Sequence, residues 1–278
     1  MTIDDLRKRL NQGHSGSLSL IGIPSDTNSS FLQGAAEAPP FIREALFSDS
    51  ANMWTETGID LGVAGTIFDA GDLLLEDTPW ETAEEAIGLL LKHDLPPIVL
   101  GGDHAISYPV VRAFQGNFPQ LSILHFDAHP DLYDDFENNP NSHASPFARI
   151  MENGLARRLV QVGIRTATGH QREQAKRFGV EMIEMRQFGP DTRICFDGPV
   201  YVSVDIDGLD PAYAPGVSHP EPGGLSTRQV LDVIQTFGGK LVGADIVEVN
   251  PRKDVNNITS IVAAKIVKEV AARIIFDR

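Results

Sequence analysis

The segment LSILHFDAHPD (residues 121–131) joins a short apolar run to a group of histidines and aspartates. A second segment, VYVSVDID (200–207), has the same form, because its apolar run also ends in acidic residues. Short apolar runs bounded by polar residues are typical of buried strands. Carboxylates that lie close together repel one another, and burying them without a neutralising partner costs free energy. The pattern therefore suggests a bound metal ion as that partner.

Strand-length apolar runs alternate with helix-like segments along the chain. Strands are expected at 17–23, 96–102, 121–127, 159–164, 200–206 and 240–250. Helices are expected at 38–47, 81–93, 106–115, 145–153, 171–179, 227–238 and 257–275. This alternation predicts an α/β fold, a three-layer αβα sandwich around a mostly parallel central sheet. Because no low-complexity linker or internal repeat divides the chain, we expect a single domain over residues 1–278.

Composition and charge restrict the classes of function. The chain has 278 residues, 42% of them hydrophobic, and a net charge of −15. This acidity argues against nucleic-acid binding and suits a small cationic substrate. Cys195 is the single cysteine, which excludes an internal disulfide and fits a reducing compartment. Since we find no signal-peptide pattern and no apolar run of membrane length, we expect a cytoplasmic protein without a membrane partner.

Polar residues follow four of the expected strands at the point where each strand ends. They are His104, the group Asp127, His129 and Asp131, the pair Asp205 and Asp207, and Glu248. In open parallel sheets, ligands bind outside the carboxyl ends of the strands, so we expect these residues to meet there. Within each group the residues are two apart, a spacing that places them on one side of an extended backbone.

Six of these residues form a candidate metal site: His104, Asp127, His129, Asp131, Asp205 and Asp207. Four carboxylates carry too much negative charge for one ion, whereas two divalent cations would balance them. Oxygen and nitrogen ligands without a thiolate favour Mn²⁺ over a structural zinc. A lone Asp after a strand is usually a turn or cap residue, but six such groups are rarely buried together without a metal. We expect His125, Asp103 and Asp245 to support the ligands through hydrogen bonds.

Three motifs resemble those of a known family. GGDHAIS (101–107), DAHPD (127–131) and SVDIDGLDPAYAPG (203–216) are similar to the signature blocks of the ureohydrolases, the arginase and agmatinase family. The segment SHASPFARIMENGLARRLVQVGIR (142–165) most resembles plant-type arginases, a branch close to the agmatinases. The resemblance implies the arginase-like αβα fold and assembly as a homotrimer or homohexamer.

The resemblance also implies a role for each matched residue. In the family, one manganese ion is held by the residues matching His104, Asp127, Asp131 and Asp205, and the other by those matching Asp127, His129, Asp205 and Asp207. Three residues are implied to be catalytic: Asp131 orients a hydroxide that bridges the ions, Glu248 binds the guanidinium, and His143 protonates the leaving amine. The expected reaction is hydrolysis of L-arginine to urea and ornithine by a dinuclear manganese enzyme.

Two long loops, expected at 51–80 and 131–143, are candidates for a functional role, and the choice of guanidino substrate depends on the second. Arginine has an α-carboxylate that agmatine lacks, and we expect Asn138, Asn139 and Ser142 to donate hydrogen bonds to it. Plant-type arginases generally read EGNKYSH where this chain reads ENNPNSH (137–143), so a Lys-Tyr pair is missing from the substrate loop. Arginine is the first expectation, and agmatine or another guanidino compound is the alternative.

Three other classes of protein stay open. A different dinuclear metallohydrolase would keep the ligands but lack a residue matching Glu248. A zinc amidohydrolase similar to the histone deacetylases would use a single metal. A non-catalytic homologue acting as a binding subunit would show the loss of a ligand, of His143 or of Glu248. All of these residues are present, which favours an active hydrolase.

Overall fold

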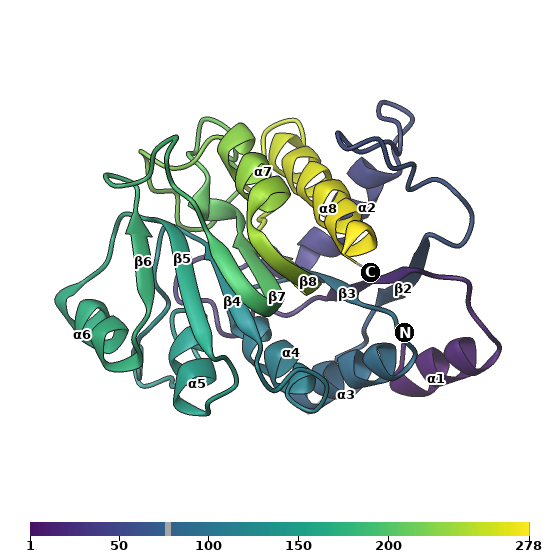
Figure 1. The fold of residues 1–278 in the computed structure, drawn as a ribbon, viewed down its shortest axis with the longest axis horizontal. Coiled ribbons are helices and arrows are strands. Elements are labelled where there is room, and N and C mark those ends of the chain that lie inside the picture. Colours follow the sequence, from purple (N-terminus) through teal and green to yellow (C-terminus); the bar gives the residue numbers. More distant parts are fainter. Residues whose placement is uncertain (76–78, 278) are drawn as a thin grey trace.

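Within the residues that the computed structural model describes, 1–75 and 79–277, eight parallel strands form one central sheet (Figure 1). The order across the sheet is β2-β1-β3-β8-β7-β4-β5-β6. The strands are β1 (Leu18–Ile23), β2 (Ile67–Asp72), β3 (Pro97–Gly101), β4 (Ser122–Phe126), β5 (Arg158–Ile164), β6 (Glu181–Glu184), β7 (Cys195–Asp205) and β8 (Gly238–Val247). The expected α/β sandwich is confirmed, and its sheet is wholly parallel in this part of the chain.

Helices cover both faces of the sheet (Figure 1). One face packs against α2 (Ala38–Leu46), α7 (Thr227–Thr236) and α8 (Ile258–Phe276), and the buried apolar side chains between them form one core. The other face packs against α1 (Ile3–Asn11), α3 (Pro79–Lys92), α4 (Ser107–Phe114), α5 (Pro146–Glu152) and α6 (Gly169–Phe178), around a second core. Strands buried on both faces explain why their sequences are nearly continuous apolar runs.

Local sequence signals explain where several helices begin and end. Prolines open α2 and α5, where a missing backbone N–H breaks no helical hydrogen bond. In α6, Thr168 and Gln171 form a reciprocal capping box, and Gly179 ends the helix with a left-handed φ of 67°. Ser226 and Gln229 form the same capping box at the start of α7.

Two strands lie where the sequence did not indicate them. β2 lies inside the segment 51–80, which was expected to be a loop, and β6 is a short strand after α6. Both are edge strands, and most of their side chains are only partly buried, so neither has a strong apolar pattern. Residues 76–78 of that expected loop, and Arg278 of the expected domain, lie outside the described residues.

Three short 3-10 helices complete the described elements. They are η1 (Ala35–Glu37), η2 (His104–Ile106) and η3 (Ile206–Gly208). η2 begins shortly after β3 and η3 directly after β7, and so they shape the edge of the sheet where the polar residues gather. Across the described residues, no helix combines the length and the apolar character that crossing a bilayer requires.

Candidate active site

The polar residues predicted from the sequence come together at the carboxyl ends of four neighbouring strands. β3 and β4 are consecutive in the chain, but β8 and β7 lie between them in the sheet. The neighbours β7 and β4 mark the point where the direction changes, because the chain leaves β4 toward β5 and leaves β7 toward β8, on the other side. Such a divergence creates a crevice of the kind that binds ligands in open α/β sheets. His104 lies just beyond β3, Asp127 just beyond β4, and Glu248 just beyond β8, while Asp205 is the last residue of β7.

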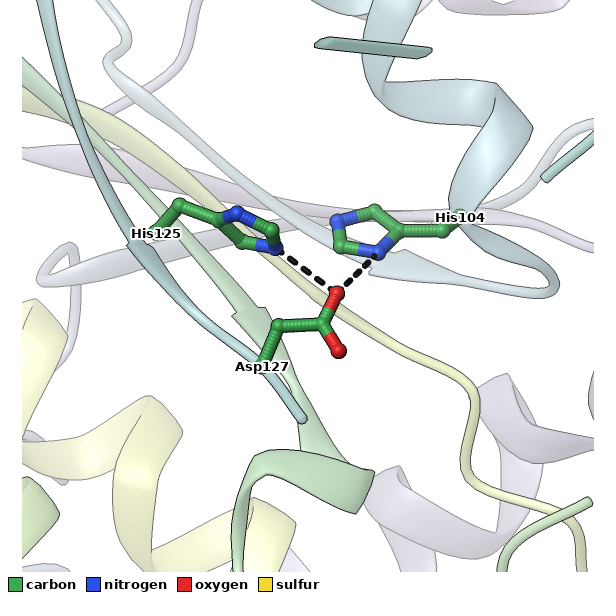
Figure 2. A group of neighbouring side chains, drawn as sticks. All are labelled: His104, His125 and Asp127. Carbon is green, nitrogen blue, oxygen red and sulfur yellow. Dashed lines mark hydrogen bonds and ion pairs between the residues drawn. The ribbon is translucent and has the colours of Figure 1, made fainter. Parts of the chain in front are cut away.

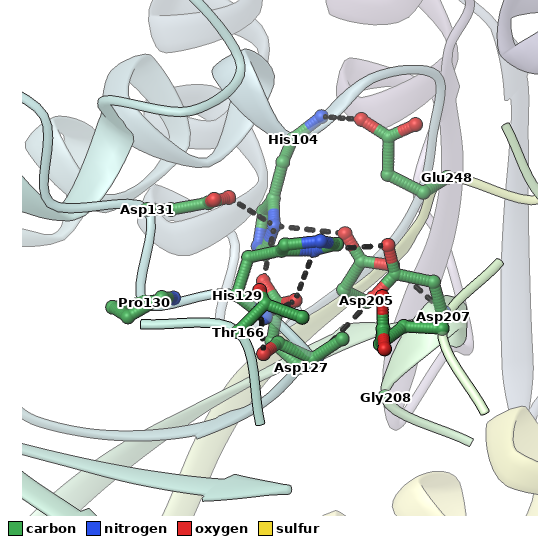
Figure 3. A network of polar contacts seen from close by, with 12 residues as sticks. His104, Asp127, His129, Pro130, Asp131, Thr166, Asp205, Asp207, Gly208 and Glu248 are labelled. Atoms are coloured by element: carbon green, nitrogen blue, oxygen red, sulfur yellow. Dashed lines mark hydrogen bonds and ion pairs between the residues drawn. The ribbon is translucent and has the colours of Figure 1, made fainter. Parts of the chain in front are cut away.

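Three carboxylates surround one imidazole nitrogen of His104. Its Nδ1 atom lies 3.0 Å from Oδ2 of Asp131, 3.2 Å from Oδ2 of Asp205 and 3.3 Å from Oδ2 of Asp127. The four side chains are buried, and they converge in Figure 3. Four ligand atoms this close to one another have the spacing of a shared coordination site.

The second nitrogen of His104 determines which tautomer faces the carboxylates. The hydroxyl of Ser203 donates to Oδ1 of Asp245 at 2.6 Å, so its oxygen accepts from Nε2–H of His104 at 2.9 Å. In the neutral ring, Nδ1 then presents a lone pair toward the three carboxylates, and no residue hydrogen-bonds to that atom. Burial alone would lower the pKa of His104, but the carboxylates raise it well above its ordinary value. A cation between the four atoms satisfies all of them at once, so these residues fit a metal ion.

A second group shares Asp127 with the first. Nδ1 of His129 lies 3.2 Å from Oδ2 of Asp207 and 3.3 Å from Oδ1 of Asp127. Asp127 thus presents one carboxylate oxygen to His104 and the other to His129, as a bridging ligand would (Figure 3). Burial opposes protonation of His129, yet Asp207 and Asp127 raise its pKa to about 12. Both imidazoles therefore lie among carboxylates whose negative charge a bound cation would neutralise.

The carboxylates themselves indicate the same need. Burial, followed by the charges of Asp207 and Asp127, raises the pKa of Asp205 well above its ordinary value. Burial also raises the pKa of Asp131 and of Asp207. Buried like charges are stable only when neutralised. We refer to the six residues His104, Asp127, His129, Asp131, Asp205 and Asp207 as the ligand cluster.

A row of polar side chains lies one step below the ligand cluster in the sheet. Gln161 of β5 pairs with His125 of β4, His125 with Ser203 of β7, and Ser203 with Asp245 of β8. In β4 and β7 the next residue on the same side of the strand is a cluster ligand, Asp127 or Asp205. The row therefore supports the ligands from beneath.

The amide of Gln161 fixes the tautomer of His125. Its Nε2 donates to the carbonyl oxygen of Pro130 at 2.6 Å and lies 3.0 Å from Nδ1 of His125, which must accept. Nε2–H of His125 consequently donates to Oδ2 of Asp127 at 2.9 Å (Figure 2). His125 is thus a hydrogen-bond donor to a ligand, as the sequence suggested. Burial lowers its pKa, and its ring stacks on Phe147 with centroids 3.9 Å apart.

The two aspartates that were expected to support the ligands do so differently. Asp245 accepts hydrogen bonds from Ser203, from Ser107 at 2.7 Å and from Tyr201 at 2.8 Å, so it acts on His104 through Ser203. Within the described part of the chain, no hydrogen bond joins Asp103 to a ligand side chain. Its carboxylate accepts from the backbone N–H of Asn28 and of Ala105 and caps η2, the turn that carries His104. The expectation for Asp103 is therefore corrected, because its partners are backbone groups.

Glu248 and His143 form a buried pair beside the ligand cluster. Oε1 of Glu248 accepts from the backbone N–H of His104 at 2.9 Å and lies 2.8 Å from Nδ1 of His143. The other oxygen, Oε2, is buried and has no hydrogen-bond partner. Glu248 and Asp131 have left-handed φ angles of 63° and 51°, a strained conformation for residues other than glycine. Such strain is often found at functional sites.

The partners of His143 fix its neutral tautomer. The backbone N–H of Ser30 donates to Nε2 of His143 at 3.1 Å, so the ring hydrogen is on Nδ1 and points at Glu248. Burial alone would lower the pKa of His143, but the charge of Glu248 raises it to about 9. The imidazole can therefore take up a second proton, on Nε2, at neutral pH, and the hydroxyl oxygen of Ser30 lies 2.8 Å from that atom and can accept from it. Burial lowers the pKa of the neighbouring His219, whose ring centroid lies 5.2 Å from that of His143.

A cavity of about 210 Å³ opens onto these groups. Its lining residues are Ser30, His129, Asp131, Tyr133, Phe136, His143, Ala144, Thr166, Gln171, Asp205, Asp207, His219 and Glu248. The volume is below the ~300–1,000 Å³ of pockets for drug-sized ligands and suits a small metabolite. Ser30, Tyr133, Phe136, Thr166 and Gln171 were missed by sequence reasoning, because nothing in their local sequence marks them.

The three residues expected to donate to an α-carboxylate are not among the lining residues. Asn138 is exposed at a turn with a φ of 63°. Asn139 donates to Oδ1 of Asn28, and the hydroxyl oxygen of the buried Ser142 accepts from the N–H of Ala144. Their role in substrate binding stays a prediction, and the loop presents Tyr133 and Phe136 to the cavity instead.

Comparisons with known proteins support the resemblance. The chain is 50% identical over 285 residues to a mitochondrial arginase of Arabidopsis thaliana, a match that covers 96% of this chain and 83% of that protein. It is 32% identical to an agmatinase of Bacillus cereus, over 90% of this chain and 89% of the relative. Among solved structures, the arginase of Medicago truncatula superposes with a TM-score of 0.90 at 45% identity, covering 98% of this chain and 94% of that one.

The expectation of a cytoplasmic location is contradicted by these relatives. The Arabidopsis relative is named a mitochondrial arginase. The inference from the single cysteine was too narrow, because a reduced cysteine does not distinguish one reducing compartment from another. The cytoplasmic interpretation is therefore withdrawn.

A family model provides the last comparison. Residues 17–272 match the model of the arginase family, a span that includes every residue of the ligand cluster together with His143 and Glu248. The sequence motifs, the parallel sheet and the buried His and Asp side chains agree with this match. The chain is a member of the arginase family, the ureohydrolases.

Proposed function

We propose that the protein hydrolyses L-arginine to urea and ornithine. The observation that carries the proposal is the buried, unpartnered Oε2 of Glu248, a residue that lines the same cavity as four members of the ligand cluster. A free carboxylate oxygen of this kind suits a guanidinium, whose N–H groups donate charge-assisted hydrogen bonds. Arginine is preferred over other guanidino compounds because relatives named arginases reach 50% identity, whereas the Bacillus cereus agmatinase is 32% identical.

We propose two Mn²⁺ ions as the cofactor. His104, Asp127, Asp131 and Asp205 would hold one ion, and Asp127, His129, Asp205 and Asp207 would hold the other. The negative charges of the four carboxylates would be balanced by two divalent ions. Ligand atoms that are only oxygen and nitrogen suit hard or borderline ions. When bound, the ions would lower the pKa of a water molecule and so provide a nucleophile near neutral pH.

The residues of the chain then divide the remaining work. Glu248 holds the guanidinium through Oε2 while Oε1 stays on the backbone of His104. Asp131 accepts a hydrogen bond from the attacking water and directs it at the guanidinium carbon. As the C–N bond to the ornithine side chain breaks, His143 delivers a proton to that nitrogen, because an amine leaves only when protonated. Its raised pKa keeps the proton available.

Agmatine is the second candidate substrate. The agmatinase relative supports it, and so does the position of Asn138, Asn139 and Ser142, none of which lines the cavity as a donor to an α-carboxylate. Agmatine would need no such donor. The two substrates share the guanidinium chemistry, so the cluster does not distinguish them.

We also propose that the chain works as one domain, residues 1–278, within a homotrimer or homohexamer. One continuous sheet supports the single domain. Association of copies is supported by apolar side chains on the surface at the start of α8, where Val255, Ile258 and Ile261 are 52%, 41% and 52% exposed.

The proposed function is tested by urea release after reconstitution with Mn²⁺. L-arginine, agmatine, 4-guanidinobutyrate and free guanidine are supplied separately at equal concentration. We expect kcat/KM for arginine to exceed that of each other compound by about tenfold or more. If agmatine is preferred, agmatine and not arginine is the substrate. If the metal-bound protein releases urea from none of the four compounds, the hydrolase assignment is refuted.

A further inference from the structure

The start of α6 forms part of the cavity wall and carries a side chain with a fixed orientation. Oε1 of Gln171 accepts hydrogen bonds from the backbone N–H of Thr168 at 3.1 Å and from its hydroxyl at 3.2 Å. These are the reciprocal bonds of the capping box that starts the helix. The carbonyl oxygen of this amide is therefore committed to the helix, and the NH₂ group must point the other way.

The NH₂ group of Gln171 is available to a ligand in the cavity. Gln171 is only 3% exposed, and it lines the cavity together with Tyr133 and Thr166. Among the described residues, no group accepts a hydrogen bond from its Nε2 atom. An amide donor that lines the cavity without a protein acceptor can donate a hydrogen bond to a ligand acceptor.

The charge distribution along the cavity indicates which ligand group this is. The carboxylates that line the cavity are Asp131, Asp205, Asp207 and Glu248, all in or beside the ligand cluster. The wall at Gln171, Thr166 and Tyr133 carries none. The amino end of α6, ten residues long, adds the partial positive charge of a helix N-terminus. This end of the cavity thus favours an anionic acceptor over an ammonium group.

We propose that Gln171 determines specificity by donating a hydrogen bond from Nε2 to the α-carboxylate of the substrate. The inference rests on the proposed function, because it places the guanidinium at Glu248 and the opposite end of the same molecule at α6. Arginine pairs this NH₂ group through its carboxylate, and agmatine, which has no carboxylate, does not. Gln171 thus does the work that was expected of the loop residues Asn138, Asn139 and Ser142.

The test exploits two capping boxes that are each closed by a glutamine, one at the start of α6 and one at the start of α7. Gln171→Glu keeps an acceptor for the cap of α6 but replaces the NH₂ group with a carboxylate oxygen that repels the substrate carboxylate. The matched control is Gln229→Glu, because Gln229 makes the same bonds to Ser226 at the start of α7 and does not line the cavity. Urea release is measured for both variants and the wild type with arginine and with agmatine.

We expect Gln171→Glu to lower kcat/KM for arginine by about 100-fold, mainly through KM, because one charge-assisted bond is lost and a repulsion is added. For agmatine we expect a change of less than about threefold, and for Gln229→Glu no change with either substrate. Equal losses with both substrates, or no loss with arginine, would overturn the inference. Failure of the wild type to release urea from either substrate would instead refute the proposed function.

A second variant covers the case in which Gln171→Glu does not fold, as judged by thermal melting. Gln171→Met removes the donor without adding charge, and Gln229→Met reports the cost of losing a cap alone. We expect Gln171→Met to lower kcat/KM for arginine about tenfold relative to agmatine. An unchanged arginine-to-agmatine ratio in Gln171→Met would contradict the role of Nε2.

Discussion

Replacing the carboxylate of Glu248 tests how the site recognises a guanidinium. In Glu248→Gln the side-chain oxygen can still accept from the backbone of His104, so the shape of the site is kept. The same oxygen still accepts from Nδ1–H of His143, and the new NH₂ group takes the place of Oε2, where it faces the guanidinium, which is also a donor. The substitution therefore removes one negative charge and introduces a donor-to-donor contact in a buried site.

The size of the effect follows from the burial of Glu248, which is 3% exposed. Breaking a buried charge pair by changing one partner costs roughly 3–5 kcal/mol. That free energy corresponds to a decrease in kcat/KM of about 10²–10⁴-fold. The pKa of His143 is raised to about 9 chiefly by Glu248, so in the variant it should fall toward its ordinary value.

The assay compares urea release from arginine with metal content and with the NMR titration of His143. Glu248 touches the ligand cluster through a backbone N–H only, so we expect the metal content to match that of the wild type. Glu37→Gln is the control, because Glu37 pairs with Arg252 on the surface. A loss of less than tenfold with unchanged metal content, or an unshifted His143 titration, would refute this account of Glu248.

Three further substitutions test other parts of the account. Ser203→Ala removes the acceptor that orients His104, and we expect metal affinity measured by calorimetry to weaken about 10–100-fold while the melting temperature stays within a few degrees. His143→Asn tests the pH dependence of stability. The pKa of His143 is raised from 6.5 to about 9, so its contribution to the unfolding free energy is complete below pH 6.5 and is lost as the pH rises through 9. In denaturant unfolding, the variant should therefore lack about 3 kcal/mol of this loss of stability. Gly102→Ala would place a Cβ 1.9 Å from the carbonyl oxygen of Ser25, and we expect it to lose roughly 3 kcal/mol of unfolding free energy or to be insoluble.

The ligand cluster could be predicted from the sequence because most of its members lie in two short motifs, each at the end of a strand. Asp127, His129 and Asp131 follow one strand at intervals of two, and Asp205 and Asp207 follow another. Parallel strands deliver such groups to the same edge of a sheet. The distances from Nδ1 of His104 and of His129 to the aspartate Oδ atoms are 3.0–3.3 Å, in agreement with the expected grouping.

The supporting side chains depend on register between strands, which the sequence does not encode locally. Gln161 is a polar residue in an apolar strand, and this was the one available signal that it has a partner. Its contact with His125 requires β5 to pair with β4 in one particular register. Ser203 and Asp245 likewise meet only because β7 and β8 are neighbours.

The substrate end of the cavity was the least predictable part. Asn138, Asn139 and Ser142 were chosen because they are polar and lie near His143 in the chain. The backbone of that loop turns Asn138 to solvent and ties Asn139 to Asn28, while Gln171 reaches the cavity from a helix 28 residues after His143. Loop conformation is set by tertiary contacts of this kind, and a single sequence does not reveal them.

The central claim is that a two-metal cluster in this chain hydrolyses arginine. The most direct measurement is a titration of metal-depleted protein with Mn²⁺, in which urea and ornithine formed from arginine are both quantified against the equivalents of metal bound. The account predicts equal amounts of the two products and a rate that reaches its plateau at two equivalents per chain. A plateau at one equivalent would contradict the two-metal cluster, and metal binding without urea would contradict the reaction itself.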